Sequence, residues 1–320
     1  MNINELKERV SLPVIVSPMF LVSGTKIVIE SCKNGIVGTF PALNGRTSED
    51  FENMLKEIIS ALEEFEKSSG IKPAPFGVNL IVNKTNPRLL PDLQLCIKYK
   101  VPIIITSLGA VKDIVDAVHD YGGIVLHDIV KKRHAEKAIE AGVDGIICVA
   151  AGAGGHAGTA NPFALVEEIR DFYKGFLVLA GAINNGKDIV ATTSIGADFA
   201  YMGTRFIATE ESLASSDYKE LLETAIIDDI IYTDAVSGVN ANFLLPSIEK
   251  SGFDLTHKKE EDFSQLSGAH AKAWKDVWSA GHGVAGIHEI LPVEKLVNNL
   301  KSQYKETLLK NSETLKSLKY

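Results

Sequence analysis

Three glycine-bearing turns are the places in this sequence where the backbone could hold a charged ligand. The stretch 152–158 has four glycines in seven residues and carries His156 at its centre. Two later turns carry Gly181 and the pair Gly203 and Thr204. Glycine lets the backbone turn with positive φ and approach a ligand closely, and the N–H groups of such turns form anion-binding nests. We therefore predict a phosphate cradle at Gly181, Gly203 and Thr204, with plain tight turns as the alternative.

The stretch 152–158 does not match the common phosphate-loop patterns. It lacks the Gly-Lys-Ser/Thr of a Walker loop, and no acidic residue ends an apolar run about 20 residues later, as a dinucleotide-binding fingerprint requires. Its many glycines instead suit a wall against which a flat ring or a substrate lies. Gly154 and Gly155 are therefore candidate cofactor contacts.

Two histidines could transfer protons near neutral pH. His127 ends an apolar run and His156 lies in the glycine stretch; a helix cap and a loop-stabilising donor are the respective alternatives. His282, which lies between two glycines, could line the same site from a second unit. Asp128 is the one acid beside these candidates and could orient a histidine or cap a helix. No set of His, Asp and Glu has metal-ligand spacing, so we expect no catalytic metal.

Other catalytic classes lack their residues in this sequence. There is no Gly-x-Ser-x-Gly elbow and no catalytic cysteine signature, and the paired carboxylates of a glycosidase are missing. Cys32, Cys96 and Cys148 lie far apart, which indicates buried thiols in a reducing compartment. One or two histidines, small polar groups and a phosphate nest remain. That set is typical of an enzyme whose cofactor carries out the chemistry.

The elements that must position these residues are short apolar runs that alternate with helix-like segments. Near-continuous apolar runs predict strands that are buried on both faces. Eight such runs within residues 1–210 predict an α/β fold, a (β/α)8 TIM barrel, with a doubly wound sheet as the alternative. The predicted strands are 13–17, 35–39, 76–81, 102–106, 123–127, 144–149, 176–180 and 198–202.

In such a barrel the ligand site lies where the strands end and the following loops begin. Those positions add further candidates on the cofactor side, namely Tyr201 and Met202 in the last predicted strand. Phe20 after the first strand and Ser107 after the fourth are assigned to the substrate side, together with His282.

Beyond the barrel we predict a smaller, mostly helical unit at 211–283 and a C-terminal helical segment at 284–320 that packs back on the barrel. The chain has 33 basic and 41 acidic residues and a net charge of −8, which argues against nucleic acid and anionic membranes as partners. The N-terminal residues have no signal-peptide core, and no apolar run approaches the ~18 residues of a membrane span. We therefore expect a cytoplasmic protein.

A series of short motifs extends over most of the chain. The motifs are Pro13-Val14-Ile15 with Ser17-Pro18-Met19, Gly77-Val78-Asn79-Leu80, His127 followed by Arg133-His134-Ala135, Ala141-Gly142-Val143-Asp144, Ala153-Gly154-Gly155-His156-Ala157-Gly158, Met202-Gly203-Thr204-Arg205-Phe206, Ser237-Gly238 with Ala241-Asn242-Phe243, and Trp278-Ser279-Ala280-Gly281. Each is weak alone. In this order and spacing they resemble the nitronate monooxygenase family, formerly called 2-nitropropane dioxygenases, which are FMN-dependent (β/α)8-barrel enzymes.

The resemblance implies contacts between individual residues and the cofactor FMN. Pro18 and Met19 would pass backbone atoms along the flavin ring, and Asn79 would donate or accept a hydrogen bond there. Gly155 would lie close to the ring. The FMN phosphate would be held by the three residues of the predicted cradle.

The resemblance also implies the reaction. His127 would lie over the flavin and bind the nitro group or take the α-proton. An alkyl nitronate, or a nitroalkane deprotonated in this way, would be oxidised with dioxygen to a carbonyl compound and nitrite. The expected partners are thus a small-molecule substrate and dioxygen, and a homodimer is left open.

Departures from the family pattern keep other functions open. Many members have glutamine where Val149 or Ala150 stands, many have a second glycine where Ala182 stands, and the segment 20–24 is bulkier here. A flavin-dependent enoyl-acyl-carrier-protein reductase using NAD(P)H is the main alternative, with His156 as its leading histidine. A flavin-free barrel lyase or isomerase and a non-catalytic flavin-binding protein are further alternatives.

Overall fold

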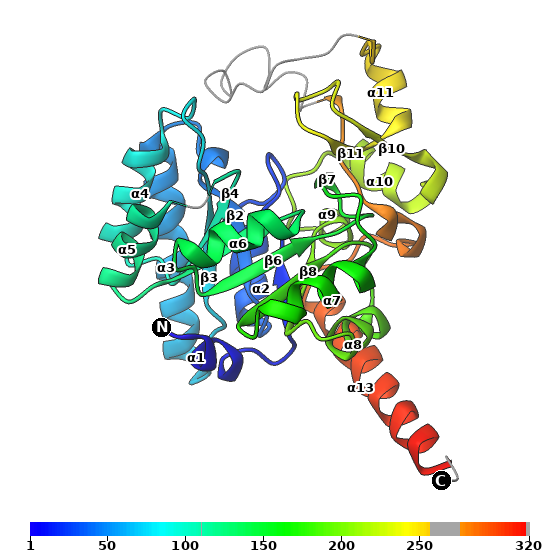
Figure 1. Ribbon diagram of the computed structural model, residues 1–320, viewed down its shortest axis with the longest axis horizontal. Helices are drawn as coiled ribbons and strands as arrows, with labels where there is room; N and C mark the ends of the chain where they lie inside the picture. Colours follow the sequence, from blue (N-terminus) through cyan, green and yellow to red (C-terminus); the bar gives the residue numbers. More distant parts are fainter. Residues whose placement is uncertain (110, 257–275, 318–320) are drawn as a thin grey trace.

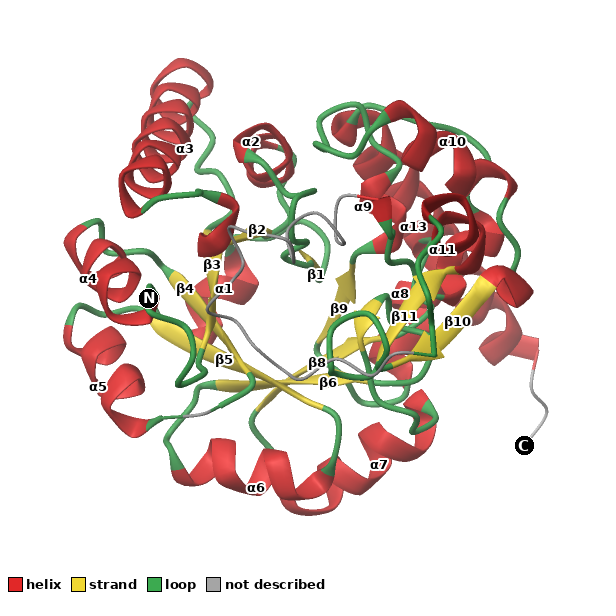
Figure 2. Ribbon diagram, turned by 90° about the horizontal axis from the view of Figure 1, so that it is seen from above, coloured by secondary structure: helices red, strands yellow, loops and turns green. Residues whose placement is uncertain are grey.

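Eight parallel strands form one closed sheet in the computed structural model, which describes residues 1–109, 111–256 and 276–317. Neighbouring strands follow the order β1-β9-β8-β6-β5-β4-β3-β2, and a bridge between Ile15 and Val37 joins the two ends. Seen from above, the strands form a ring that helices surround (Figure 2). The predicted (β/α)8 barrel is confirmed. Its strands are β1 (Val14–Val16), β2 (Gly38–Pro41), β3 (Phe76–Ile81), β4 (Ile103–Ser107), β5 (Ile124–Ile129), β6 (Gly145–Val149), β8 (Phe176–Ala180) and β9 (Phe199–Met202).

The second strand begins later than predicted. We expected it at 35–39, but β2 covers Gly38–Pro41. Gly35 has φ of +80° and closes the turn after the helix 25–33, so this glycine belongs to the turn and not to the strand. The chain becomes extended only after this turn, and Val37 makes the bridge to β1.

Helices cover the outside of the ring and begin or end at caps that the sequence supplies. The longest of them, α3, begins after Thr47, whose side chain accepts a hydrogen bond from the N–H of Asp50, and it ends at Gly70 with φ of +72°. The helices of the barrel are α2 (Thr25–Lys33), α3 (Ser48–Ser69), α4 (Leu89–Lys98), α5 (Lys112–Asp120), α6 (Lys132–Glu140), α7 (Pro162–Phe172), α8 (Gly186–Ser194) and α9 (Thr204–Ile207), with the short 3-10 helix η1 (Ala42–Asn44) after β2.

Apolar side chains fill the barrel from its amino end. The N-terminal helix α1 (Ile3–Glu8) places Leu6, which is fully buried, in the same inner cluster as Ile15, Ile103 and Ile147. A second apolar cluster lies between the strands and the surrounding helices. The polar side chains considered below therefore lie at the opposite, carboxyl ends of the strands.

A smaller unit follows the barrel and lies beside its carboxyl end (Figure 1). It contains helices, as predicted, but also a three-stranded antiparallel sheet, which the sequence did not suggest. In this sheet β11 pairs with β10 on one side and with β7, a part of the glycine stretch, on the other. Residues 257–275 of the predicted unit lie outside the described residues. The elements are β7 (Gly155–His156), α10 (Ser216–Thr224), η2 (Ile227–Asp229), β10 (Ile230–Thr233), β11 (Ala241–Leu244), α11 (Leu245–Ser251) and η3 (His282–Gly286).

The C-terminal helix α13 (Val293–Ser317) packs on the barrel with its first half. Its buried residues Val293, Leu296, Val297 and Leu300 lie against α8 and α2. Its second half extends away from the body (Figure 1), and residues 318–320 of the predicted segment lie outside the described residues. The division into 1–210, 211–283 and 284–320 stays a prediction.

Candidate active site

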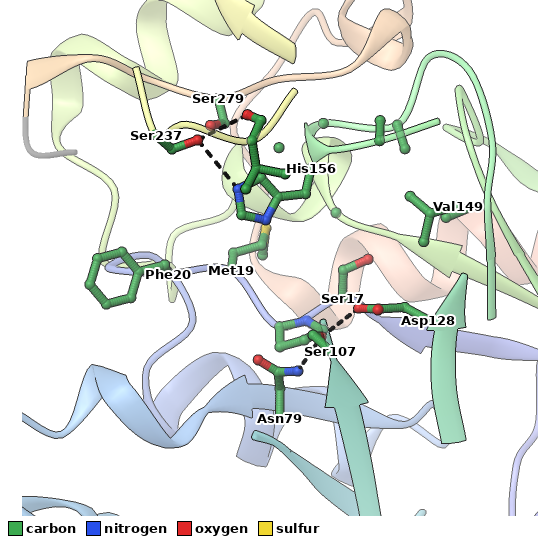
Figure 3. A pocket seen from close by; sticks show the side chains of 18 of the residues that line it. Ser17, Met19, Phe20, Asn79, Ser107, Asp128, Val149, His156, Ser237 and Ser279 are labelled. Atoms are coloured by element: carbon green, nitrogen blue, oxygen red, sulfur yellow. Dashed lines mark hydrogen bonds between the residues drawn. The ribbon is translucent and has the colours of Figure 1, made fainter. Parts of the chain in front are cut away.

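A large cleft of about 2680 Å³ opens at the carboxyl ends of the barrel strands and extends under the smaller unit. Its walls come from the loop after β1, the ends of β3, β4 and β5, and the glycine stretch (Figure 3). Thirteen of the fifteen residues predicted for the site line this cleft: Pro18, Met19, Phe20, Asn79, Ser107, His127, Gly154, Gly155, His156, Gly181, Tyr201, Gly203 and Thr204.

The two remaining residues, Met202 and His282, lie outside the lining of the cleft. The side chain of Met202 is fully buried in the cluster between strands and helices, and its carbonyl accepts a 2.9 Å hydrogen bond from the N–H of Ser17. His282 begins η3, and its N–H donates to the carbonyl of Gly152 at 2.9 Å. Both residues therefore support the loops of the site from behind.

The side chain of His127 lies on the outer face of β5, next to the helices, whereas the resemblance implied a place over the flavin. Successive side chains of a strand point to opposite faces. In β5, Leu126 belongs to the cluster inside the barrel, whereas Val125 and Ile129 belong to the cluster next to the helices. His127 shares the outer face with them. Its side chain is 5% exposed, and its Nδ1 lies 2.8 Å from the hydroxyl of Thr106.

The environment of His127 favours its neutral form. Burial, together with the charge of nearby His134, lowers the pKa of this imidazole to about 4. The ring borders the outer edge of the cleft, beside the start of α6, and not the mouth of the barrel. We interpret His127 as a structural histidine.

His156 is the histidine that faces the barrel mouth. It lies in β7, and its ring points from the upper wall into the cleft, above the ends of β3, β4 and β5 (Figure 3). Its Nε2 lies 3.4 Å from the hydroxyl oxygen of Ser237, and that hydroxyl donates its proton to the carbonyl of Val239 at 3.0 Å. Ser237 therefore contacts the imidazole at its Nε2 edge.

The lowered pKa of His156 keeps its imidazole neutral near neutral pH. Burial between the glycine stretch and the smaller unit lowers it to about 4, so the imidazole is neutral at pH 7. The ring is only partly exposed. A neutral imidazole that faces the cleft can accept a proton, and its lowered pKa makes it a weaker base than a free imidazole.

Three polar side chains form a hydrogen-bonded chain on the floor of the cleft. Asn79 lies near the end of β3, Ser107 ends β4, and Asp128 lies near the end of β5. All three side chains lie on the inner face of the barrel. Nδ2 of Asn79 donates to the hydroxyl of Ser107 at 2.8 Å, and that hydroxyl donates to Oδ2 of Asp128 (Figure 3). The second Nδ2 hydrogen bond of Asn79 goes to the carbonyl of Ile105 at 3.2 Å.

Burial also raises the pKa of Asp128 to about 6, which the hydrogen bond from Ser107 opposes. Tyr201 of β9 faces the same space, and the charge of Asp128 contributes to the raised pKa of its phenol, although burial is the larger cause. The floor therefore holds a carboxyl group whose charge changes near neutral pH.

The glycines at the ends of β7 and β9 leave room for a ligand. A Cβ added to Gly155 would have no heavy atom within 4 Å. One added to Gly203 would meet Ser17 only at ordinary contact distances of 3.5 Å. Gly181, in contrast, has φ of +137°, and its Cβ would approach the carbonyl of Ala151 to 2.8 Å. Within the predicted cradle, Gly181 thus requires glycine, Gly203 has room for a small side chain, and both turns line the cleft.

Side-chain hydrogen bonds and close packing join the smaller unit to the glycine stretch and to Thr204. The hydroxyl of Thr204 accepts the N–H of Gly281 at 2.9 Å, and its own proton can point toward an anion. Nδ2 of Asn242 in β11 donates to the carbonyl of Ala153 at 2.7 Å. A Cβ on Gly154 would lie 2.9 Å from the backbone nitrogen of Gly281, so this glycine is required for packing.

Sequence reasoning did not assign Ser237 or Ser279 to the site and gave Asp128 only an auxiliary role. The hydroxyl of Ser279 lies in the wall beside His156, is buried, and has no hydrogen-bond partner in the described part of the chain (Figure 3). Both serines belong to motifs of the C-terminal half, so the motif positions were the available signal.

Two classes of feature are not found in the described ranges 1–109, 111–256 and 276–317. No group of three His, Cys, Asp or Glu side chains there could hold a metal ion. None of the helices in those ranges is both long and apolar enough to cross a membrane.

Comparison with known proteins places this site in a family. A family model described as nitronate monooxygenase matches residues 42–303. The nitronate monooxygenase of Neurospora crassa is 26% identical over 93% of this chain and 90% of its own length. The structure of a nitroalkane oxidase from Streptomyces ansochromogenes superimposes with a TM-score of 0.81 at 22% identity and covers 95% of this chain and 99% of its own.

Another relative carries a different functional name. The (3aS,4S,5R,7aS)-5-hydroxy-7a-methyl-1-oxo-octahydro-1H-indene-4-carboxyl-CoA dehydrogenase of Mycobacterium tuberculosis is 24% identical over 71% of this chain. This chain spans 61% of that relative and 65% of its counterpart from Rhodococcus jostii, which is less than two thirds of each. The family model, in contrast, covers most of the chain, so the protein belongs to the nitronate monooxygenase family.

Proposed function

We propose that this protein is an FMN-dependent enzyme that oxidises alkyl nitronates or nitroalkanes with dioxygen to a carbonyl compound and nitrite. The observation that carries the proposal is the position of His156. Its neutral imidazole faces the floor of the cleft across the space between the glycine cradle and the loop after β1. Family membership and the likeness to a nitroalkane oxidase fold support the same reaction class.

The residues present fit FMN at the carboxyl end of the barrel. The turns at Gly181 and Gly203, with the hydroxyl of Thr204, would hold its phosphate. The backbone of Pro18 and Met19 and the wall at Gly155 would flank its ring. When bound, the flavin accepts electrons from the substrate and passes them to dioxygen.

The protein's own groups position the substrate and handle its proton. A ring nitrogen of His156 takes the α-proton of a neutral nitroalkane, and the hydroxyl of Ser237 lies beside Nε2 of the resulting imidazolium. The same imidazolium offers an N–H to a nitronate oxygen. The hydroxyl of Ser279 lies in the same wall and supplies a further donor. The smaller unit covers these groups and limits the access of water.

Two measurements test the proposal. Purified protein is expected to show the visible absorption of bound flavin and to release FMN on denaturation. It is also expected to consume dioxygen and form nitrite with propionate-3-nitronate. A colourless protein that binds no added FMN would overturn the cofactor assignment, and a flavin-loaded protein without nitrite formation would overturn the reaction.

The size of the cleft favours a second candidate function, the reduction of an enoyl thioester by NAD(P)H. A volume of about 2680 Å³ exceeds the roughly 300–1,000 Å³ of sites for single small molecules. A long thioester or a second nucleotide would use the additional space, and one relative is named for a CoA thioester. Rapid bleaching of the flavin by NADH, with turnover of crotonyl thioesters, would favour this function. Bleaching by nitronate alone would favour the first.

A further inference from the structure

Asp128 places a carboxyl group at the bottom of the cleft, on the inner face of the barrel. Alternation along β5 puts Leu126 inside the barrel and His127 outside it, so the next side chain returns to the inside. The hydrogen bond from Ser107, which also faces inward, agrees with this position. Figure 3 shows the two side chains side by side beneath His156.

The hydrogen bonds of the floor run in one direction and end on this carboxyl group. Nδ2 of Asn79 donates one hydrogen bond to Ser107 and one to the carbonyl of Ile105. The hydroxyl proton of Ser107 is then donated to Oδ2 of Asp128. The floor therefore presents oxygen acceptors to the cleft, unless Asp128 itself carries a proton and becomes a donor.

No basic side chain compensates the charge of Asp128 in the described part of the chain. The groups that face it are the phenol of Tyr201 from β9, the imidazole of His156 from β7, and the hydroxyl of Ser107 from β4. Val149 of β6 is apolar. Arg88, which also lines the cleft, is held 2.9 Å from a carboxylate oxygen of Asp92.

Burial without a counter-ion disfavours a carboxylate and would also disfavour negative charge on a group bound above it. A bound flavin gains negative charge when it is reduced. The two charges would repel each other across a floor that has no counter-ion, and this repulsion is relieved when Asp128 takes up a proton.

We propose that Asp128 sets the reduction potential of the bound flavin, so that two-electron reduction of the flavin is accompanied by uptake of a proton from solvent onto the Asp128 carboxylate. The electrons come from the nitronate in turnover or from dithionite in an experiment. The proton forms an O–H bond on the carboxyl group while the hydrogen bond from Ser107 stays in place. The inference rests on the proposed flavin binding, and it concerns a group that the proposed reaction does not otherwise use.

Linkage gives the direction of the effect. If reduction of the flavin raises the proton affinity of Asp128, then protonation of Asp128 raises the reduction potential of the flavin by the same coupling free energy. Asparagine has the shape of the protonated acid and carries no charge. The variant Asp128→Asn therefore keeps the neutral state at every pH.

Spectroelectrochemical titration of the flavin-loaded protein tests the proposal between pH 5 and pH 8. Asp128→Asn is expected to have a more positive midpoint potential than the wild type at pH 8, and the difference is expected to shrink toward pH 5. Asp120→Asn, the same change at the exposed end of α5, is the control and should match the wild type. Equal potentials for Asp128→Asn and the wild type across this range would overturn the inference.

A second variant keeps the test valid if Asp128→Asn does not fold. Ser107→Ala removes the donor that stabilises the carboxylate, so its potential at pH 7 should also be more positive than that of the wild type. An unchanged or lower potential would contradict the proposal. A protein that binds no flavin would instead refute the proposed function, so the two failures are distinguishable.

Discussion

Replacing His156 with asparagine tests the assignment of the proton acceptor. Asparagine keeps a polar group near Ser237 but cannot take a proton, so kcat/KM for a neutral nitroalkane should fall by about 10²- to 10⁴-fold. A preformed nitronate needs no deprotonation, and its kcat/KM should fall much less. Flavin binding should persist, because the predicted phosphate contacts lie at the ends of β8 and β9. His127→Asn is the matched control and should leave both rates near those of the wild type.

The pH dependence of wild-type activity tests how far burial lowers the pKa of His156. An imidazole with the ordinary pKa of about 6.5 is neutral in about one molecule in ten at pH 5.5. The pKa of His156 is lowered to about 4, which leaves nearly all of it neutral at that pH. Because the neutral form is the base, activity with the nitroalkane should stay near its plateau at pH 5.5 and fall only as the pH approaches 4.

Stopped-flow reduction of the flavin under anaerobic conditions is the appropriate assay, because it isolates the step before dioxygen reacts. If nitroalkane reduced the flavin of His156→Asn as fast as that of the wild type, His156 would not be the proton acceptor. An acid limb near pH 6.5 in the wild type would show that the cleft does not desolvate the imidazole as the structure indicates.

Three further predictions follow from buried groups. The pKa of His127 is about 4 in the folded protein and about 6.5 in the unfolded chain, so the unfolded chain binds more protons between these pH values. The free energy of unfolding should therefore fall by up to about 3 kcal/mol from pH 6.5 to pH 4. In urea titrations, His127→Asn should show a weaker dependence of this free energy on pH. Gly203→Val should fold but bind FMN more weakly in a fluorescence titration. The control Gly186→Ala should lower the melting temperature, because its Cβ would clash with the backbone nitrogen of Tyr304. The three cysteines are buried and burial raises their thiol pKa values, so a thiol reagent should label none in the native protein and three after denaturation; fast native labelling would contradict the packing.

The barrel could be predicted because its signals are local. Each strand is a short apolar run, and helix caps such as Thr47 and Gly70 mark the intervening segments. Seven of the eight predicted strands overlap closely with observed strands, and the displaced one lies at a turn that Gly35 closes with positive φ. Strand order and closure then follow from the small number of ways in which alternating strands and helices can pack.

The direction of side chains at the strand ends could not be predicted in the same way. A strand of a parallel barrel is apolar on both faces, so its sequence shows no alternation from which the inner face can be identified. His127 and Asp128 are adjacent, and choosing between them required the register of β5 against its neighbours. The sequence suggested His127 as the catalytic residue and Asp128 as an auxiliary one, and the structure places the acid on the inner face of β5 and the histidine on its outer face.

The small sheet was missed for a different reason. Its strand β7 consists of Gly155 and His156, which have no strand preference, and it pairs with Ala241 and Asn242, far along the chain. Such a pairing depends on tertiary contacts that a single sequence does not reveal. As a result, the approach of Ser237 to His156 could not be foreseen, although both residues belong to recognised motifs.

A crystal structure of the protein with FMN is the most direct test of the central claim. We expect the FMN phosphate between the turns at Gly181 and Gly203, with the flavin ring lying between His156 above and the chain of Asn79, Ser107 and Asp128 below. A flavin whose phosphate lies elsewhere, or whose ring does not lie between the imidazole and the floor, would contradict it.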